Sequence, residues 1–112
     1  MSGIAAAIFG CSGPKLSQAE AKFFAAAQPW GFILFARNVE TPDQLRQLTD
    51  DLRAAVGRDA PILIDQEGGR VQRLRAPHWR EWLPPLDQIN QTSDPERAMY
   101  IRARVISDEL RD

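Results

Sequence analysis

A carboxylate, a glycine pair and three arginines lie close together in the middle of the chain. They are Asp65, Gly68, Gly69, Arg70, Arg73 and Arg75. A carboxylate accepts hydrogen bonds from sugar hydroxyls or ligates a metal, and a guanidinium clamps polar ligands. Glycines let the backbone turn sharply or approach a ligand closely. The segment therefore has the composition of a ligand-binding loop, and the alternative is a plain turn with surface arginines.

Three roles are open to Asp65: it could bind sugar hydroxyls, ligate a metal or act as a catalytic carboxylate. No His, Asp or Glu cluster at ligand spacing accompanies it, which argues against a metal site. If a strand continued through Asp65, Glu67 would share its face and the two could imitate the carboxylate pair of a glycosidase. We favour a turn at Glu67, where the carboxylate caps backbone groups or pairs with an arginine. Arg73 is the favoured ligand clamp, whereas Arg70 and Arg75 are expected to brace the loop.

Two further groups of residues could do chemistry, and both have a simpler structural interpretation. Arg37 and Asn38 could bind a ligand, but we favour a role in tying neighbouring loops together. The segment 10–13 (GCSG) resembles a phosphate loop superficially, yet it lacks the Gly-Lys-Ser/Thr ending and the three-glycine spacing of nucleotide-binding loops.

The only histidine, His78, lies in a Pro-His-Trp sequence with no Ser or Cys nucleophile nearby. We expect it to have a structural role. Trp79 and Trp82 could stack on a sugar ring. Tryptophans in a proline-rich loop more often anchor the loop to the core, and we favour that role.

Three apolar runs predict the strands that position these groups: Ile4–Phe9, Phe32–Ala36 and Ile62–Ile64. They do not alternate apolar with polar residues, so they suit strands buried on both faces of a parallel sheet. Asp65 directly follows the third run. Ligand sites of parallel α/β proteins gather beyond the carboxyl ends of the strands.

Helix signals separate the predicted strands. Ser17 and Glu20 form a capping box, and Thr41 and Gln44 form a second one around a first-turn proline. Gly57 is a suitable stop for the second helix. A last helix starts near residue 93 and carries Met99, Arg102, Val105, Ile106 and Leu110.

The predicted order is β-α-β-α-β, an irregular stretch over residues 67–92, and then a helix. This order indicates an α/β fold with a parallel sheet and right-handed crossovers. Three strands leave two open sheet edges, and no stop signal follows the last helix. Both features suggest a piece of a larger fold.

Composition narrows the classes of function. The chain has 112 residues, 44% of them hydrophobic and 26% charged, which suits one small globular domain. Its net charge of −1 argues against nucleic acid or an anionic membrane as the main partner. No segment is long enough to span a bilayer, and Cys11 has no second cysteine to pair with. The apolar start has no basic residue before Lys15, so a strand is favoured over a signal peptide, and we expect a cytoplasmic protein.

Three segments resemble one known family. They are GFILFARN at residues 31–38, the helix pattern from Thr41 to Arg53, and IDQEGGRVQRL at residues 64–74. In this order and spacing they resemble the bacterial β-N-acetylhexosaminidases of glycoside hydrolase family 3. The resemblance covers nearly the whole chain. Those enzymes are cytoplasmic and trim N-acetylglucosamine from muropeptides in peptidoglycan recycling.

The resemblance implies a (β/α)8 TIM barrel, of which residues 1–112 are the incomplete N-terminal portion. It implies that Asp65 and Arg73 bind the non-reducing N-acetylglucosamine. It also implies a retaining mechanism, in which a carboxylate nucleophile forms a glycosyl-enzyme that water hydrolyses. The usual general acid/base of this subfamily is a histidine on a mobile loop. No cofactor or metal is implied.

One departure is decisive for the roles within this chain. In the family, the Lys-His segment, the acid/base loop and the nucleophilic aspartate come after the position of Asp112, and His78 does not match the acid/base histidine. We therefore expect no catalytic residue here, and we expect the fragment alone to be inactive and prone to self-association. The alternatives are a β-glucosidase of the same family, or a non-catalytic α/β sugar-binding or interaction module.

Overall fold

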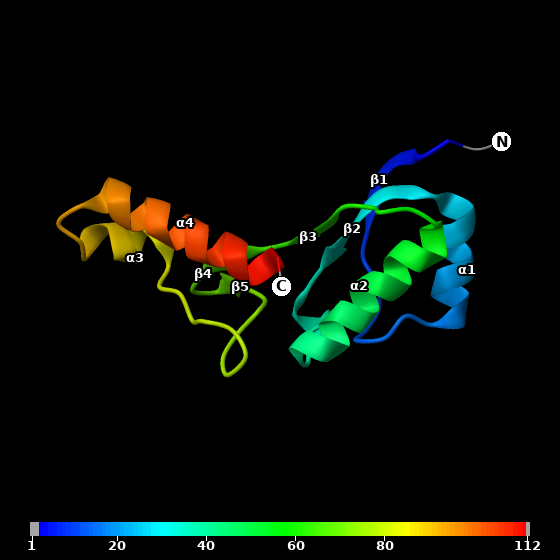
Figure 1. The fold of residues 1–112 in the computed structure, drawn as a ribbon, viewed down its shortest axis with the longest axis horizontal. Coiled ribbons are helices and arrows are strands. Elements are labelled where there is room, and N and C mark those ends of the chain that lie inside the picture. Colours follow the sequence, from blue (N-terminus) through cyan, green and yellow to red (C-terminus); the bar gives the residue numbers. More distant parts are fainter. Residues whose placement is uncertain (1–2, 112) are drawn as a thin grey trace. The chain divides into compact units, whose positions relative to one another are not determined.

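The computed structural model of the chain describes residues 3–111. It divides into two compact units, the first ending at Asp65 and the second beginning at Gln66. Each unit contains its own sheet and its own pair of helices, so we describe them one at a time (Figure 1).

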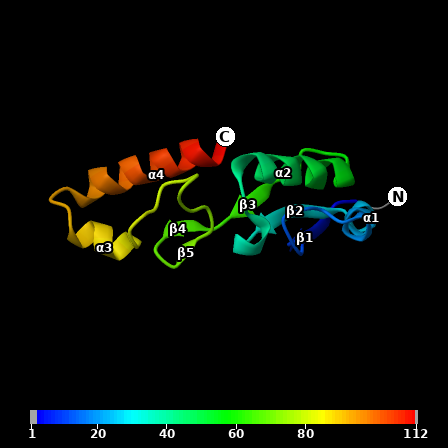
Figure 2. The ribbon, with the colours of Figure 1, turned by 90° about the horizontal axis from the view of Figure 1, so that it is seen from below.

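The first unit has a three-stranded parallel sheet in the order β1-β2-β3. The strands are β1 (Ala5–Phe9), β2 (Pro29–Leu34) and β3 (Ile62–Ile64). The crossovers are helices α1 (Gln18–Ala27) and α2 (Pro42–Val56). In Figure 2, α2 covers one face of the strands. The predicted β-α-β-α-β order and the parallel sheet are confirmed.

The core of the first unit lies between the sheet and its two helices. Its aromatic centre is the edge-to-face pair of Phe24 and Phe32, with ring centroids 5.0 Å apart. Leu48 and Leu52 of α2 are almost completely buried beside Phe32. Burying such a side chain stabilises the fold by about 1.5–3 kcal/mol. The apolar stripe of α2 is therefore the main contact that holds the helix on the sheet.

The expectation of strands buried on both faces is wrong for the described residues. Ile8, Trp30 and Leu63, one on each strand, are 47%, 46% and 40% exposed. The physical reason is that α1 and α2 pack on a single face, to which Phe32 and Leu34 point. The other face of the sheet is apolar and open to solvent at these three positions.

Local chemistry sets the helix ends where the sequence predicts them. Both capping boxes form: the Ser17 and Thr41 side chains accept hydrogen bonds from the backbone N–H groups three residues on. Gly57 ends α2 in the left-handed conformation, with φ of 70°. Gln28 ends α1 in the same region, with φ of 49°.

The second strand lies earlier than the predicted range of Phe32–Ala36. It begins at Pro29, directly after the left-handed turn at Gln28, and ends at Leu34. The chain then leaves the sheet because the Asn38 side chain accepts a hydrogen bond from the Phe35 N–H at 2.8 Å, which closes a short 3₁₀ turn over Ala36–Asn38.

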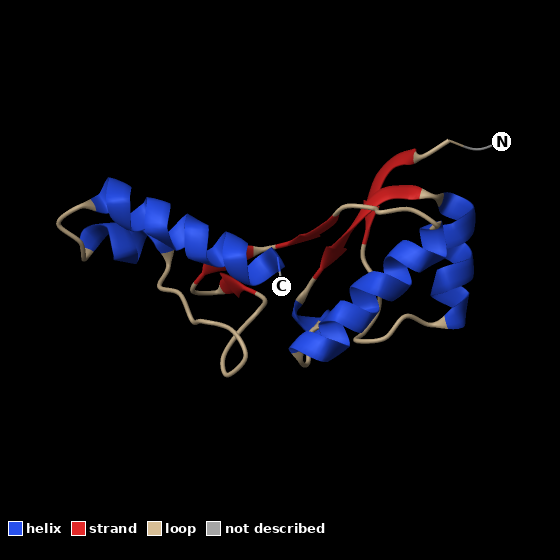
Figure 3. Cartoon of the chain, in the orientation of Figure 1, coloured by secondary structure: helices blue, strands red, loops and turns tan. Residues whose placement is uncertain are grey.

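The second unit is more regular than predicted. It contains the antiparallel strands β4 (Gln66–Gly68) and β5 (Val71–Gln72), followed by α3 (Pro85–Asn90) and α4 (Pro95–Arg111). Figure 3 shows this hairpin and helix pair. The expectation of an irregular stretch over residues 67–92 is therefore wrong for the hairpin and for α3, and it is confirmed for residues 73–84 between them. Strands of two or three residues, rich in Gln and Gly, show no alternation and have low strand propensity, so the pattern hides them.

The helices were compared with the requirements of a membrane-spanning segment. Within residues 3–111, no helix combines the length and the apolar character that crossing a membrane requires.

The side chain of Gln44 makes more hydrogen bonds than its part in the capping box requires. Its Oε1 accepts hydrogen bonds from the Glu40 and Thr41 N–H groups, at 2.7 and 3.3 Å, and its Nε2 donates to the carbonyls of Pro14 and Asn38, at 2.6 and 2.8 Å. It thus joins the start of α2 to the loop after β1.

We predict that Gln44→Ala destabilises the protein more than Thr41→Ala. Loss of the cap at Thr41 should cost about 1 kcal/mol. Loss of the four hydrogen bonds of Gln44 should cost about 2–3 kcal/mol, at roughly 1 kcal/mol for each net bond and less where water replaces a partner. Urea denaturation midpoints measure both. Thr49→Ala, on the same helix, is the control and should change stability by less than about 0.5 kcal/mol. Equal midpoints for the two capping variants would show that the tie to Pro14 is not formed.

Candidate functional site

The carboxyl ends of the three parallel strands meet at one edge of the first unit. The loop of residues 10–13 follows β1, the 3₁₀ turn follows β2, and Asp65 follows β3. Leu34 pairs with Ile64, so the 3₁₀ turn after β2 and Asp65 after β3 begin at the same level of the sheet. Asp65 is half-buried at this edge. The structure therefore places Asp65 at a strand tip, as the sequence predicts, in the position where parallel sheets carry ligands.

Asn38 and Arg37 tie the loops at this edge together. Asn38 is fully buried, and its Nδ2 donates to the carbonyls of Cys11 and Gly13 at 3.1 and 2.8 Å. Arg37 Nε donates to the Cys11 carbonyl at 3.0 Å, and its guanidinium lies 4.9 Å from the ring centre of Phe35. The expected structural role of these two residues is confirmed. Burial raises the pKa of the Cys11 thiol, which keeps it in the protonated, poorly nucleophilic form.

A glycine turn links the two strands of the hairpin that follows Asp65. Gly68 and Gly69 both have positive φ, 101° and 65°. The turn is also tightly enclosed: a Cβ on Gly68 would collide with the guanidinium of Arg102 and the carbonyl of Leu83, and one on Gly69 would lie 2.7 Å from Cγ of Pro84. Only glycine satisfies both the conformation and the space at these two positions.

The side chain of Gln66 holds the main chain of Arg73. Its Oε1 accepts hydrogen bonds from the N–H groups of Arg73 and Leu74, at 3.1 and 3.0 Å, and its Nε2 donates to the Leu74 carbonyl at 2.8 Å. Arg73 follows β5 directly and is half-buried. The residue next to Asp65 in the chain is thus the one that fixes the backbone of Arg73.

A second glutamine joins the hairpin to the loop before α3. Gln72 is 2% exposed, and its Nε2 donates to the carbonyls of Leu74 and Arg80 at 2.8 and 2.7 Å. Its Oε1 accepts a hydrogen bond from the Trp82 N–H at 3.0 Å. Together the two glutamines pair backbone groups that no strand ladder reaches, which is what burial of such groups requires.

Arg102 of α4 lies beneath the hairpin. It is 4% exposed, its Nη2 donates to the carbonyl of Glu67, and its Nη1 donates to the side chain of Gln88. Its guanidinium also lies over the ring of Trp82, 5.5 Å from the centroid. Burial lowers the pKa of the Arg102 guanidinium, although its ordinary value is high enough to leave it charged.

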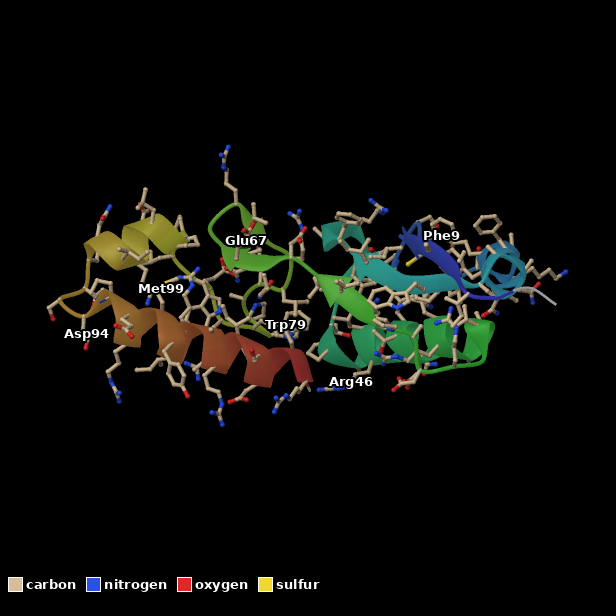
Figure 4. All side chains as sticks on the ribbon, turned by 90° about the horizontal axis from the view of Figure 1, so that it is seen from above. Phe9, Arg46, Glu67, Trp79, Asp94 and Met99 are labelled. Carbon is tan, nitrogen blue, oxygen red and sulfur yellow. The ribbon has the colours of Figure 1, made fainter. Side chains whose placement is uncertain are left out.

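The remaining candidates have mixed outcomes. Arg75 braces the loop as expected, through an ion pair with Glu81 at 2.8 Å and a hydrogen bond to the Gly69 carbonyl. Arg70 does not: it is exposed and makes no hydrogen bond or ion pair with the described part of the chain. Glu67 lies in β4 rather than in a turn, with its side chain exposed on the hairpin (Figure 4). Its backbone carbonyl, not its carboxylate, accepts the hydrogen bond from Arg102.

Trp82 has the structural role that the sequence predicts. Its side chain is half-buried, and the guanidinium of Arg102 lies over its ring. His78 is exposed, and its ring meets that of Trp79 edge-on at 5.7 Å. Across residues 3–111, no three His, Cys, Asp or Glu side chains are grouped so that they could hold a metal ion.

Asp65 belongs to the first unit and Arg73 to the second, and each is engaged by other groups of the protein. Their joint action on one sugar therefore stays a prediction. Sequence reasoning missed the residues that support the hairpin and the backbone of Arg73, which are Gln66, Gln72 and Arg102. Only Arg102 carried a signal, as a charged residue on the otherwise apolar face of its helix.

Several curated bacterial β-hexosaminidases are similar to this chain. That of Alkalilimnicola ehrlichii is 38% identical over 91 residues, which are 81% of this chain and 26% of the relative. That of Methylobacillus flagellatus is 39% identical over 106 residues, 88% of this chain and 29% of the relative. The chain spans about a quarter to a third of the length of these relatives. No family model matches it.

Solved structures of NagZ from Neisseria gonorrhoeae share the fold. One, in complex with zinc ion, matches with a TM-score of 0.81 at 30% identity over 96% of this chain and 33% of that chain. Another, in complex with N-trifluoroacetyl-D-glucosamine, matches with a TM-score of 0.79 at 30% identity over the same shares. These matches confirm the predicted fold class, the first part of a (β/α)8 barrel, and the resemblance noted in three sequence segments.

We predict that Gly68→Ala destabilises the protein by about 3 kcal/mol or more, since strain at positive φ and overpacking each cost roughly 1–3 kcal/mol. Gly57→Ala is the matched control. It also has positive φ, but nothing lies within 4 Å of its Cβ position, so strain alone should cost about 1 kcal/mol. Thermal or urea unfolding measures both. Similar losses for the two variants would contradict the enclosed turn.

Proposed function

This chain is a relative of the bacterial β-hexosaminidases, and we propose that its protein hydrolyses terminal non-reducing N-acetyl-β-D-glucosamine residues from muropeptides in peptidoglycan recycling. The observation that carries the proposal is the strand tip at Asp65, followed by a hairpin whose glutamine network fixes Arg73. The names of the sequence relatives support it. So does the N-acylated glucosamine ligand of the related NagZ structure.

Within this proposal, residues 1–112 form the N-terminal portion of one barrel domain and supply part of the sugar-binding subsite. Asp65 accepts hydrogen bonds from hydroxyls of the non-reducing sugar, and Arg73 donates to its polar oxygens. Charge-assisted hydrogen bonds of this kind are worth about 1.5–3 kcal/mol each. They orient the sugar, so that its anomeric carbon is presented to the reacting groups.

The proposed chemistry is a retaining hydrolysis. A carboxylate attacks the anomeric carbon while an acid protonates the leaving oxygen, and water then releases the sugar from the glycosyl-enzyme. The resemblance to the family assigns both reacting groups to segments beyond residue 112, so no catalytic residue is proposed in this chain. Asp65 and Arg73 would act by holding the substrate.

We also propose a cytoplasmic setting for this activity. The one cysteine of the chain is a buried free thiol, which suits a reducing compartment.

We expect Asp65→Ala and Arg73→Ala each to lower kcat/KM of the full-length protein by roughly tenfold to a hundredfold, the loss of one charge-assisted hydrogen bond. The assay is turnover of an aryl N-acetyl-β-D-glucosaminide. Arg70→Ala is the matched control, because Arg70 is exposed on the same hairpin and should keep kcat/KM within about twofold. Wild-type kinetics for the Asp65 variant would remove that residue from the site.

Residues 1–112 on their own are expected to turn over no glycoside and to self-associate. The resemblance to the family assigns the nucleophile and the proton donor to segments beyond residue 112. Ile8, Trp30 and Leu63 expose an apolar sheet face, which favours association. The same aryl glycoside and light scattering test both statements. Turnover at the rate of a complete enzyme would refute the first, and a monodisperse monomer would refute the second.

A further inference from the structure

Arg102 is a buried cation that the proposed sugar-binding role does not use. It is 4% exposed, and its hydrogen-bond partners within residues 3–111 are neutral groups, the Glu67 carbonyl and the Gln88 side chain. Burial of a charge without a carboxylate partner is costly, so its contacts must compensate. The Glu67 carbonyl belongs to strand β4 of the hairpin, and Gln88 belongs to α3.

A short chain of hydrogen bonds leads from Arg102 to Arg73. Arg102 fixes the carbonyl of Glu67 in β4. The neighbouring residue, Gln66, accepts from the N–H groups of Arg73 and Leu74 at 3.1 and 3.0 Å. A shift of β4 would therefore be passed to the backbone of Arg73 through the Gln66 side chain, in addition to the pairing of β4 with β5.

A second connection runs through Trp82. The guanidinium of Arg102 lies over the Trp82 ring. The backbone of Trp82 bonds to β5 and to the turn of the hairpin: its N–H donates to Gln72 Oε1 at 3.0 Å, and its carbonyl accepts from the Gly69 N–H at 2.9 Å. Arg102 thus contacts the hairpin directly and also contacts the segment that runs beside it.

We propose that Arg102 is a positioning residue for sugar binding, which fixes the β4–β5 hairpin and through it the placement of Arg73. The proposal rests on the function proposed above, in which Arg73 binds the sugar. The absence of a side chain on Gly68 leaves the space that the guanidinium fills, so the turn and Arg102 form one packed unit. A shorter or uncharged side chain at residue 102 would leave that space partly empty and would weaken or remove the hydrogen bond to the Glu67 carbonyl.

The test compares Arg102→Met with Arg104→Met in the full-length protein. Arg104 lies two residues away on α4, but its side chain is 67% exposed, and its one ion pair among the described residues is with Asp108 at 3.8 Å. Arg102→Met should raise KM for an aryl N-acetyl-β-D-glucosaminide roughly tenfold while kcat changes less, because misplacement of a binding group acts on substrate binding. Arg104→Met should leave KM unchanged. Arg102→Lys, which keeps the charge but replaces the planar guanidinium with a single ammonium group, should give an intermediate KM, and it carries the test if Arg102→Met does not fold.

A double-mutant comparison separates positioning from general weakening of the fold. In an Arg73→Ala background, Arg102→Met should raise KM no further, since the group that it positions is gone. An equal further rise in that background, or an unchanged KM in the Arg102 single variants, would overturn the proposal.

Hydrogen exchange gives a readout that does not depend on the sugar. The Arg73 and Leu74 amides should exchange faster in Arg102→Met, whereas the Phe32 amide, bonded to the Pro61 carbonyl at 2.9 Å, should not change. Faster exchange in a protein without glycosidase activity would refute the proposed function and keep the link from Arg102 to Arg73. Unchanged exchange at both amides would overturn that link, whatever the activity.

Discussion

Backbone groups that no strand ladder can pair determine the form of the segment between Gln66 and Trp82. Its strands are only two and three residues long, so most of its N–H and C=O groups have no partner within the sheet. The amide side chains of Gln66 and Gln72 supply those partners, with six hydrogen bonds to main-chain groups. Because an amide side chain has a fixed set of donors and acceptors, each glutamine specifies one arrangement of the loop.

The two residues that the proposed function assigns to sugar binding are supported in different ways. The parallel sheet fixes Asp65 through the pairing of β3 with β2. Gln66 then begins the hairpin and fixes the main chain of Arg73. In the proposed function, strand pairing therefore positions Asp65, the acceptor, and side-chain hydrogen bonds position Arg73, the donor to the same sugar ring. Rigid support of this kind lowers the entropy that binding must overcome.

Sequence alone predicts the parts of the molecule that local chemistry determines. The capping boxes at Ser17 and Thr41 and the stop at Gly57 follow from short-range rules, and β3 lies where its apolar run predicts. The β4–β5 hairpin escapes prediction because its strands are too short to show a period. The buried role of Arg102 escapes because its partners, Glu67 and Gln88, are distant in sequence. The motif around Asp65 and Arg73 identifies both residues, whereas the network that supports the backbone of Arg73 is visible only in the three-dimensional structure.

The central claim is that Asp65 and Arg73 hold one N-acetylglucosamine ring. A crystal structure of the full-length protein with bound N-acetylglucosamine tests it most directly. The account predicts the Asp65 carboxylate and the Arg73 guanidinium within about 3.2 Å of oxygens of the same sugar. A sugar bound elsewhere, or one that contacts neither side chain, would contradict it.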